Sequence, residues 1–254
     1  MNIKKFFTSL SKSSSPTDPC EIHNTYISFV KDILSFTYPS TTKNPNLLRL
    51  NAIDKILRDL ALNEQHYILQ YAMRDEHDFF YHPIFSQNAP KCPKCGELHN
   101  CHATITTPKT PISFDIAHHP TISKPWNRAR LINTLSSIGS SVDKPFTFDK
   151  LNHFGSTLFP LFNLLLIRNG FHSSTCGIYE TKAIYHPEYI CDCSSFYNEV
   201  YFDGISFRHV PCNHVISTPA NKSIGTIYEI GRLILENNLS FLTLLEHEQN
   251  THKF

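Results

Sequence analysis

The two cysteines of Cys92-Pro-Lys-Cys95-Gly96 have the spacing of a metal-binding motif. With two residues between them, both thiolates can reach one tetrahedral ion, and the glycine relieves the tight turn that follows. His99 and Cys101 lie close behind and complete a compact Cys/His set. Four protein ligands leave no open position for a catalytic water, so we predict a structural zinc site formed by Cys92, Cys95, His99 and Cys101.

The remaining cysteines leave alternatives open. The second half of the site could instead come from Cys191, Cys193, Cys212 or His214. A complete zinc signature has a second well-spaced pair of ligands, which we do not identify in this chain, and the thiols could also be reduced side chains of a polar loop. The chain has 8 cysteines but no secretory signal, so we expect thiols or metal ligands rather than disulfides, and a cytoplasmic protein.

A candidate anion site follows the apolar run Leu161–Ile167, where the chain reads Asn169-Gly170-Phe-His172-Ser173-Ser174. We interpret this as a buried strand, an Asn-Gly turn and the start of a short helix, where unpaired backbone N–H groups favour an anion. The predicted ligand-binding residues here are Asn169, Gly170, Ser173 and Ser174, with His172 as a catalytic candidate. Ordinary N-capping with a packed histidine is the alternative.

Just upstream, Asp149-Lys-Leu-Asn152-His153 places a carboxylate, an amide and an imidazole close together in the sequence. Such groups can orient one another for proton transfer or for holding a ligand. Asp203 and Glu180 could converge on the same cleft, although an aspartate before Gly204 also suits a tight turn. The predicted catalytic set is Asp149, His153, His172 and Asp203, with Asn152 as a further ligand-binding residue.

Apolar periodicity predicts the elements that must position these groups. The steps of three and four residues from Ile22 to Leu34 and from Leu47 to Leu60 are typical of amphipathic helices, and Asn63–His66 opens a third. This helical N-terminal third could serve as scaffold or as a partner-docking segment. Residues 79–124 are rich in proline and histidine and predict loops and short strands, with His118 and His119 in a solvated loop.

The second half of the chain mixes both element types. A helix is predicted from Pro125 to Ile138, with Gly139 past its end, and Leu161–Ile167 is predicted as a buried strand. Asp203-Gly204 predicts a hairpin between 199–202 and 205–210. The segment 224–248 is predicted to form two helices or one helix broken near its asparagines.

Composition excludes several classes of protein. Hydrophobic residues make up 41% and charged residues 18% of the chain, which is typical of a folded protein. The net charge of +1 provides no overall field for holding nucleic acid, and neither common glycine-rich phosphate loop is present. No apolar run is long enough to span a bilayer, so we expect a soluble protein without a membrane partner.

The order of motifs resembles a bacterial family of unknown function. The motifs are Pro125-Trp126-Asn-Arg128-x-Arg130, Asp149-x-x-Asn152-His153, Asn169-Gly170-x-His172-Ser173 and Asp203-Gly204. More distantly, the order of helix, strand, turn and helix is similar to the ParB/sulfiredoxin-like fold. That resemblance implies that His172 and Ser173 contact phosphate and that Arg128 or Arg130 neutralises charge. It also implies that an acid such as Asp149 or Glu180 holds Mg²⁺ or activates water.

We therefore predict an α+β protein with a mobile tail at 1–19, a helical segment at 20–90, a loop-rich region with a zinc knuckle at 91–124 and an α+β core at 125–254. The predicted function is binding of a phosphate-bearing ligand, a nucleotide or a nucleic-acid end, with hydrolysis or transfer of phosphate as the reaction class. The alternative is a non-enzymatic protein that meets a protein partner and contains a structural zinc site.

Overall fold

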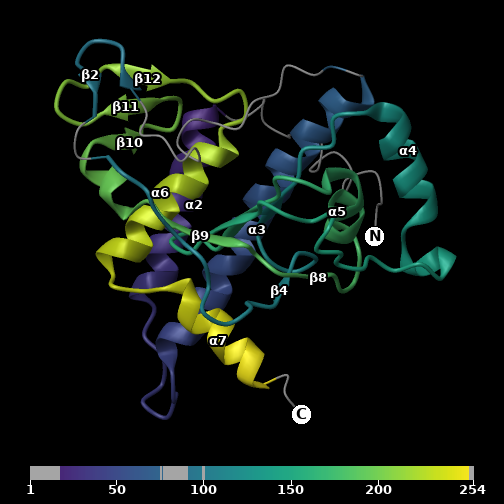
Figure 1. The fold of residues 1–254 in the computed structure, drawn as a ribbon. Helices are drawn as coiled ribbons and strands as arrows, with labels where there is room; N and C mark the ends of the chain where they lie inside the picture. The colour runs from purple at the N-terminus through teal and green to yellow at the C-terminus, as the bar shows by residue number, and fades with distance from the viewer. Residues whose placement is uncertain (1–17, 75, 77–90, 99–100, 252–254) are drawn as a thin grey trace, which may run out of the picture.

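The computed structural model describes residues 18–74, 76, 91–98 and 101–251, and four long helices form one side of it (Figure 1). These helices are α2 (Pro19–Ser35), α3 (Pro45–Met73), α6 (Ser223–Glu236) and α7 (Phe241–Thr251). Helix α3 packs against α6, α2 and α7. The N-terminal and C-terminal parts of the chain therefore lie side by side in one helical layer.

Local sequence explains where the first two helices begin. The side chain of Asp18 accepts a hydrogen bond from the N–H of Cys20, and that of Asn44 accepts one from the N–H of Leu47. In both helices a proline follows the cap, where its missing N–H costs nothing. The predicted third helix is a continuation of α3, and the side-chain amide of Asn63 donates a hydrogen bond to Ser223 Oγ of α6 instead of capping a new helix.

A five-stranded mixed sheet lies beside the helical layer. Its strands run in the order β3 (Thr104–Thr106), β9 (Tyr189–Asp192), β6 (Thr157–Phe159), β7 (Leu164–Leu166) and β5 (Thr121–Ile122). Strand β7 is the predicted apolar strand, confirmed but shorter at both ends. The backbone of Asn163 has a φ of 45°, so the chain turns there before the strand begins.

The remaining described strands form three smaller sheets. They are β1 (Lys91–Cys92) with β2 (Gly96–Glu97), β4 (Phe114–Asp115) with β8 (Ile184–Tyr185), and β10 (Val200–Phe202), β11 (Phe207–His209) and β12 (Val215–Ser217) in that order. The predicted hairpin is β10–β11. Its turn is longer than predicted, because Phe202 pairs with Phe207 and the carboxylate of Asp203 accepts the N–H groups of Ile205 and Ser206.

Two shorter helices follow in the middle of the chain, and the first of them contacts α3 through Leu131. Helix α4 (Arg128–Ser137) confirms the helix predicted between Pro125 and Ile138, and it starts after Asn127, whose side chain accepts the N–H of Arg130. Helix α5 (Phe171–Ile178) packs against α4. Two short 3₁₀ helices are also present, η2 (Ser140–Val142) and η3 (Ser194–Asn198).

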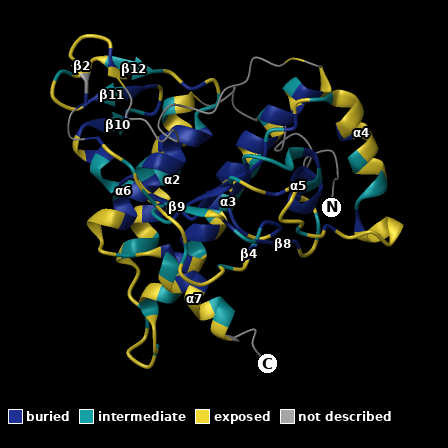
Figure 2. Ribbon diagram, viewed as in Figure 1, coloured by how far each residue is buried: buried dark blue, intermediate teal, exposed yellow. Residues whose placement is uncertain are grey.

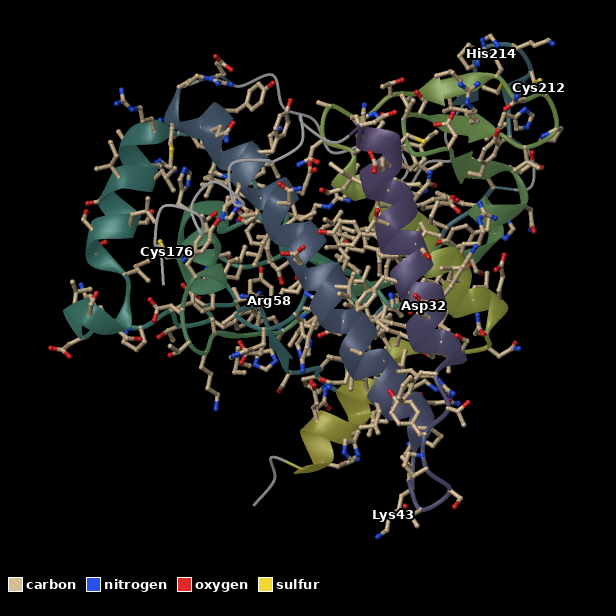
Figure 3. All side chains as sticks on the ribbon, turned by 180° about the vertical axis from the view of Figure 1, so that it is seen from behind. Asp32, Lys43, Arg58, Cys176, Cys212 and His214 are labelled. Carbon is tan, nitrogen blue, oxygen red and sulfur yellow. The ribbon has the colours of Figure 1, made fainter. Side chains whose placement is uncertain are left out.

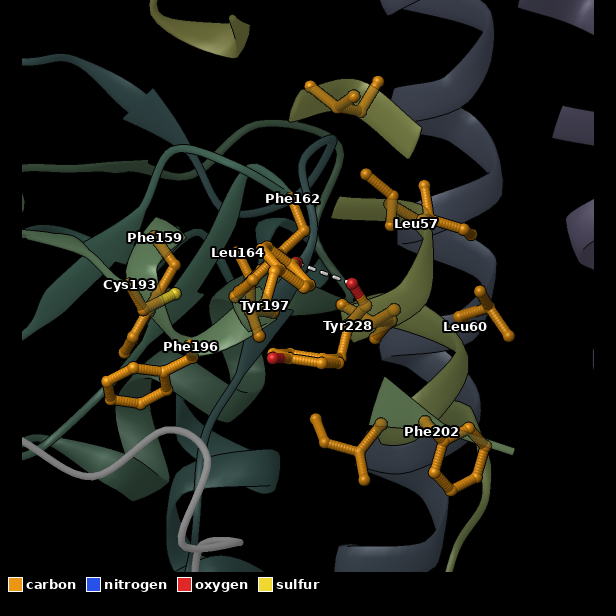
Figure 4. Close-up of a cluster of buried hydrophobic side chains, with 14 of the residues drawn as sticks. Leu57, Leu60, Phe159, Phe162, Leu164, Cys193, Phe196, Tyr197, Phe202 and Tyr228 are labelled. Atoms are coloured by element: carbon orange, nitrogen blue, oxygen red, sulfur yellow. Dashed lines mark hydrogen bonds between the residues drawn. The ribbon is translucent and has the colours of Figure 1, made fainter. Parts of the chain in front are cut away.

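The main hydrophobic core joins the helical layer to the sheet (Figure 2). Leu57 and Leu60 of α3 meet Phe159 and Phe162 of the sheet region and Tyr228 of α6 in this cluster (Figure 4). Inside it, the hydroxyl of Tyr197 donates a hydrogen bond to the carbonyl oxygen of Tyr228 at 2.7 Å. The arrangement confirms the α+β class. None of the described helices has both the length and the apolar character needed to cross a bilayer.

Candidate functional site

Four potential metal ligands gather where β1–β2 meets β11–β12. They are Cys92, Cys95, His209 and Cys212, and their ligand atoms all lie within 4.8 Å of one another. The Sγ atoms of Cys92 and Cys212 are 3.7 Å apart. Two sulfurs on one tetrahedral Zn²⁺, each bonded at about 2.3 Å, are separated by about 3.8 Å. The donor set and this separation both fit a zinc ion.

The two halves of the cluster have the same local design. Each half places two ligands with two residues between them, followed by a residue with positive φ, 83° at Gly96 and 56° at Asn213. In this backbone conformation the chain turns back sharply behind the second ligand. In the second half the N–H of Asn213 donates to the carbonyl oxygen of His209 at 2.8 Å, which closes the turn.

Hydrogen bonds within the cluster favour a thiolate at Cys212. Partial burial by itself would raise the pKa of Cys212, but its contacts with the His209 ring, with the backbone at His214 and with the neighbouring thiols lower it to about 6. The proton is retained at Cys95, whose hydrogen bond to Cys212 raises its pKa to about 11. A thiolate is the form of cysteine that binds metal, so one ligand of the cluster is already prepared.

The structure brings only part of the predicted zinc set into this cluster. Cys92 and Cys95 belong to it, whereas His99 lies outside the described residues. Cys101 lies elsewhere, with its buried thiol directed at the carbonyl oxygen of Phe196, and burial raises its pKa to about 12. Of the alternatives left open, Cys212 is in the cluster, while Cys191 and Cys193 lie in the hydrophobic core.

Sequence reasoning missed His209 as a ligand. The signal was present in His209-Val-Pro-Cys212-Asn213, which repeats the two-residue spacing and the turn residue of the first pair. A search for cysteine pairs alone passes over it, because the second pair is mixed. The expectation that the chain lacks a second well-spaced pair of zinc ligands is therefore wrong, because His209 and Cys212 form that pair.

A pocket of about 590 Å³ lies on the opposite side of the molecule, at the start of α5. Figure 3 shows this separation, with Cys212 and His214 at one end and Cys176 of α5 at the other. Many of the predicted site residues line the pocket: Arg130, Asp149, Asn152, His153, Asn169, Gly170, His172 and Ser173. The structure thus brings together three segments, around 130, 150 and 170, each of which contains predicted site residues.

His153 is held by two hydrogen bonds in this pocket. Its Nδ1 accepts the backbone N–H of Asp149 at 2.8 Å, and its Nε2 lies 2.8 Å from the Oγ of Ser173. An amide N–H can only donate, so the neutral ring carries its proton on Nε2 and donates it to Ser173. Burial lowers the pKa of His153, against a smaller opposing effect of Asp149, which favours this neutral form.

His172 is arranged in a similar way. Its Nε2 accepts the backbone N–H of Asn127 at 3.2 Å, so the neutral ring carries its proton on Nδ1. Burial, followed by the charge of Arg130, lowers the pKa of His172. The ring also meets the edge of Trp126, with ring centroids 5.8 Å apart. His172 is 9% exposed, so it is a buried neutral donor at the pocket wall.

Asp149, Arg130 and the start of α5 provide further polar groups of the pocket. The carboxylate of Asp149 accepts hydrogen bonds from the N–H of Leu151 and from the side-chain amide of Asn152. Arg130 places its guanidinium over the ring of Trp126, 5.4 Å from the centroid. Helix α5 begins after Gly170, and no side chain caps it. The first backbone N–H groups of the helix therefore have no side-chain acceptor at the end that lies beside the pocket.

Some predicted residues do not line this pocket. Asp203 lies in the β10–β11 turn and is paired with Arg208. Arg128 is exposed on α4, and Ser174 is fully buried, with an Oγ that has no hydrogen-bond partner in the described part of the chain. Glu180 accepts hydrogen bonds from Ser140 instead of facing Asp149.

His119 is only 6% exposed, so the predicted placement of this side chain in a solvated loop is wrong. Its Nδ1 lies 2.9 Å from Asp54 of α3 and its Nε2 lies 3.0 Å from Glu248 of α7. The bracketing carboxylates raise its pKa to about 10 although burial alone would lower it. His118, beside it, has a side chain that is 62% exposed.

Comparison with known proteins gives a family but no activity. The family model of DUF6710, described as a family of unknown function, matches residues 3–241. No curated protein and no solved structure matches the chain. The expected resemblance to a family of unknown function is confirmed, whereas similarity to the ParB/sulfiredoxin-like fold stays a prediction.

Proposed function

The chain belongs to DUF6710, a family of unknown function, and we propose from its two sites that it is a zinc-stabilised protein that binds a phosphate-bearing ligand. The carrying observation is the Cys92/Cys95/His209/Cys212 cluster, in which four donors lie within 4.8 Å. Three sulfurs and one nitrogen suit Zn²⁺, and four protein ligands give it a structural role. The ion would tie the short β1–β2 hairpin to the three-stranded sheet.

Metal content and ligand substitutions test this site. The purified full-length chain is expected to hold about one zinc, as structural sites of this composition do. Cys95→Ser and Cys212→Ser should lose the metal, while Cys191→Ser, which changes a core thiol outside the cluster, should keep it. Zinc retained by Cys212→Ser, or lost only from Cys191→Ser, contradicts the assignment.

The donors of the α5 pocket support an acceptor-rich ligand. Arg130 supplies a guanidinium, His172 a proton on Nδ1, and α5 the uncapped N–H groups of its first turn. Because the Asp149 oxygens already accept hydrogen bonds, its charge is partly compensated within the pocket. A phosphate group accepts hydrogen bonds at every oxygen and is favoured at the positive end of a helix dipole.

The same geometry favours binding over hydrolysis. A general base needs a free lone pair near the reacting proton. In both His153 and His172 the unprotonated ring nitrogen already accepts a backbone N–H. Asp149 is the one carboxylate among the residues that line this pocket, and its oxygens already accept hydrogen bonds. We therefore propose ligand binding as the function of this pocket.

Fluorescence titration can follow this pocket directly. Trp126, the single tryptophan of the chain, lines it, so the intrinsic fluorescence reports on the site. Inorganic phosphate, a nucleoside triphosphate and a short 5′-phosphorylated DNA strand are the probes. Arg130→Ala should weaken binding of the best probe about tenfold or more, since a charge-assisted contact is lost.

Arg128→Ala is the matched control, since Arg128 is exposed on the same helix and does not line the pocket. Its binding should stay within about twofold of the wild type, as expected for an exposed charge outside the site. Equal losses in the two variants would indicate general charge attraction and contradict the pocket. Binding of none of the probes would leave the zinc-containing interaction protein as the better explanation.

A further inference from the structure

We propose that Glu199 is a positioning residue of the metal site, because its carboxylate fixes the proton of His209 on Nε2 and so presents Nδ1 to the metal. This inference rests on the proposed zinc site and adds to it the ligand atom of the histidine and the group that selects it. Zinc-bound histidines commonly donate their other ring N–H to a carboxylate, which orients the ring and raises its basicity.

Two contacts define which nitrogen faces which partner. The Nε2 of His209 lies 2.9 Å from Oε2 of Glu199, and the Nδ1 lies 3.0 Å from the Sγ of Cys212. The side chains of His209 and Glu199 are only 6% and 11% exposed. The imidazole ring of His209 therefore lies between the carboxylate of Glu199 on one side and the thiol of Cys212 on the other, and water has little access to it.

The chemistry of imidazole turns this geometry into a ligand assignment. A metal bond requires a lone pair, so the nitrogen that binds the metal carries no proton and the other nitrogen of the neutral ring does. Because Nδ1 is the nitrogen beside the thiols, the proton belongs on Nε2. The carboxylate of Glu199 can only accept there, so it stabilises the tautomer that leaves Nδ1 free for the metal.

The backbone holds Glu199 in place for this role. Its N–H donates to the carbonyl oxygen of Phe196 at 3.0 Å, which closes the last turn of η3. Its own carbonyl oxygen accepts the N–H of Val210, the residue after His209, at 2.8 Å. These two hydrogen bonds hold the main chain of Glu199 next to His209, so its side chain needs to span only a short distance to contact the ring.

A simple ion pair is the competing role for Glu199. An ion pair needs His209 protonated on both nitrogens, and a protonated Nδ1 cannot bind a metal. The two roles therefore differ in the zinc-loaded protein. Positioning requires a neutral ring with metal on Nδ1 and hydrogen on Nε2, whereas an ion pair requires His209 to remain off the metal.

The test compares Glu199→Gln with Glu199→Leu in the full-length chain. Gln keeps an oxygen that can accept the Nε2–H, while Leu has a similar size and offers no acceptor. Zinc affinity is measured by competition with a chromogenic chelator, and long-range ¹H–¹⁵N correlations of histidine-labelled protein report the tautomer. Glu199→Leu should weaken zinc binding about 10–100-fold, whereas Glu199→Gln should stay within about threefold.

The possible outcomes separate this inference from the site itself. In zinc-loaded wild type, a His209 signal with the proton on Nε2 and the metal on Nδ1 supports the inference even if Glu199→Leu does not fold. Metal on Nε2, or equal zinc affinity in Glu199→Leu and wild type, overturns it while the four-ligand site stands. Zinc binding that survives Cys212→Ser overturns the site and the inference together.

Discussion

The Nε2 of His153 lies 2.8 Å from the Oγ of Ser173, and both residues line the α5 pocket beside Gly170. Gly170, at the cap of α5, has a φ of 70°. A Cβ added there would lie 2.1 Å from Cδ2 of His153 and 2.8 Å from the carbonyl oxygen of Asn152. Glycine at this position therefore permits both the backbone conformation and the close approach of the imidazole.

Gly170→Ala should accordingly disturb both stability and the pocket. The added methyl forces His153 away from Ser173 and also strains the backbone, so we expect a loss of about 2–4 kcal/mol in the free energy of unfolding. Urea denaturation measures it, and Trp126 fluorescence in the folded protein reports the displaced pocket wall.

Gly155→Ala provides the control for Gly170→Ala. Gly155 has a similar φ of 72°, but its added Cβ would meet only Cβ of Arg168, at 3.3 Å. It should cost about 1 kcal/mol, mainly from the backbone conformation. Equal losses in the two variants would show that the contact with His153 contributes nothing.

Glu64 gives the folded protein a distinctive dependence on pH. This side chain of α3 is 5% exposed, its Oε2 has no hydrogen-bond partner in the described part of the chain, and burial raises its pKa to about 8. Between pH 4.5, its ordinary pKa, and about 8, the unfolded chain loses this proton while the folded chain keeps it. The contribution of Glu64 to stability is therefore greatest below pH 4.5 and falls as the pH rises through this window.

Glu64→Gln should remove that part of the pH dependence. Relative to the variant, zinc-loaded wild type should lose stability by up to about 1.4 kcal/mol per pH unit between pH 5 and 8. Urea unfolding of both proteins at a series of pH values measures the difference, and metal effects common to both cancel. Parallel stability curves would mean that Glu64 titrates normally in the folded state.

His119 lies between Asp54 and Glu248, and we expect removal of these two carboxylates to lower the free energy of unfolding by unequal amounts. Asp54 is buried and also accepts a hydrogen bond from the Asn163 amide at 2.7 Å, whereas the Glu248 side chain is 34% exposed. Removing one charge of a buried pair leaves the other uncompensated, so Asp54→Asn should cost about 3 kcal/mol. Glu248→Gln should cost about 1 kcal/mol or less, because solvent screens that pair.

The pH dependence of the Asp54 loss tests the charge of His119. Because its folded pKa is raised to about 10, the stability it contributes is fully present below pH 6.5 and is lost as the pH rises through about 10. The difference in unfolding free energy between wild type and Asp54→Asn should shrink between pH 7 and 10.5. A constant difference would mean that the charge of His119 does not change in this pH range.

The sequence allowed the local elements to be predicted better than their long-range contacts. Helix α4 and strand β7 follow from the apolar spacing around Leu131 and Leu165, because both are set by neighbours along the chain. His119 shows the limit. Its partners come from α3 and α7, 65 and 129 residues away, and nothing in the local sequence identifies them.

The two sites show the same contrast. Asp149, His153 and His172 were predicted from residue type, and all three line one pocket. The turn at Gly170 brings the start of α5, with His172, next to Asp149 and His153. Asp203 was selected by the same reasoning, but its carboxylate serves its own turn and Arg208. The partnership of Cys92 with Cys212 depends on a pairing across 120 residues, and only the spacing of His209 and Cys212 hinted at it.

Metal removal should release one half of the zinc cluster and leave the other folded. The β1–β2 hairpin has two residues in each strand, whereas β11 lies between β10 and β12 in a sheet whose Phe202 and Phe207 are buried in the main core. A chelator should therefore accelerate trypsin cleavage after the exposed Lys94 by about tenfold or more, since local opening controls proteolysis.

Cleavage after Lys150, exposed near the α5 pocket, is the internal control and should not change. Equal acceleration at both lysines would mean that the whole chain unfolds without metal, and unchanged cleavage at Lys94 would mean that no metal holds the hairpin.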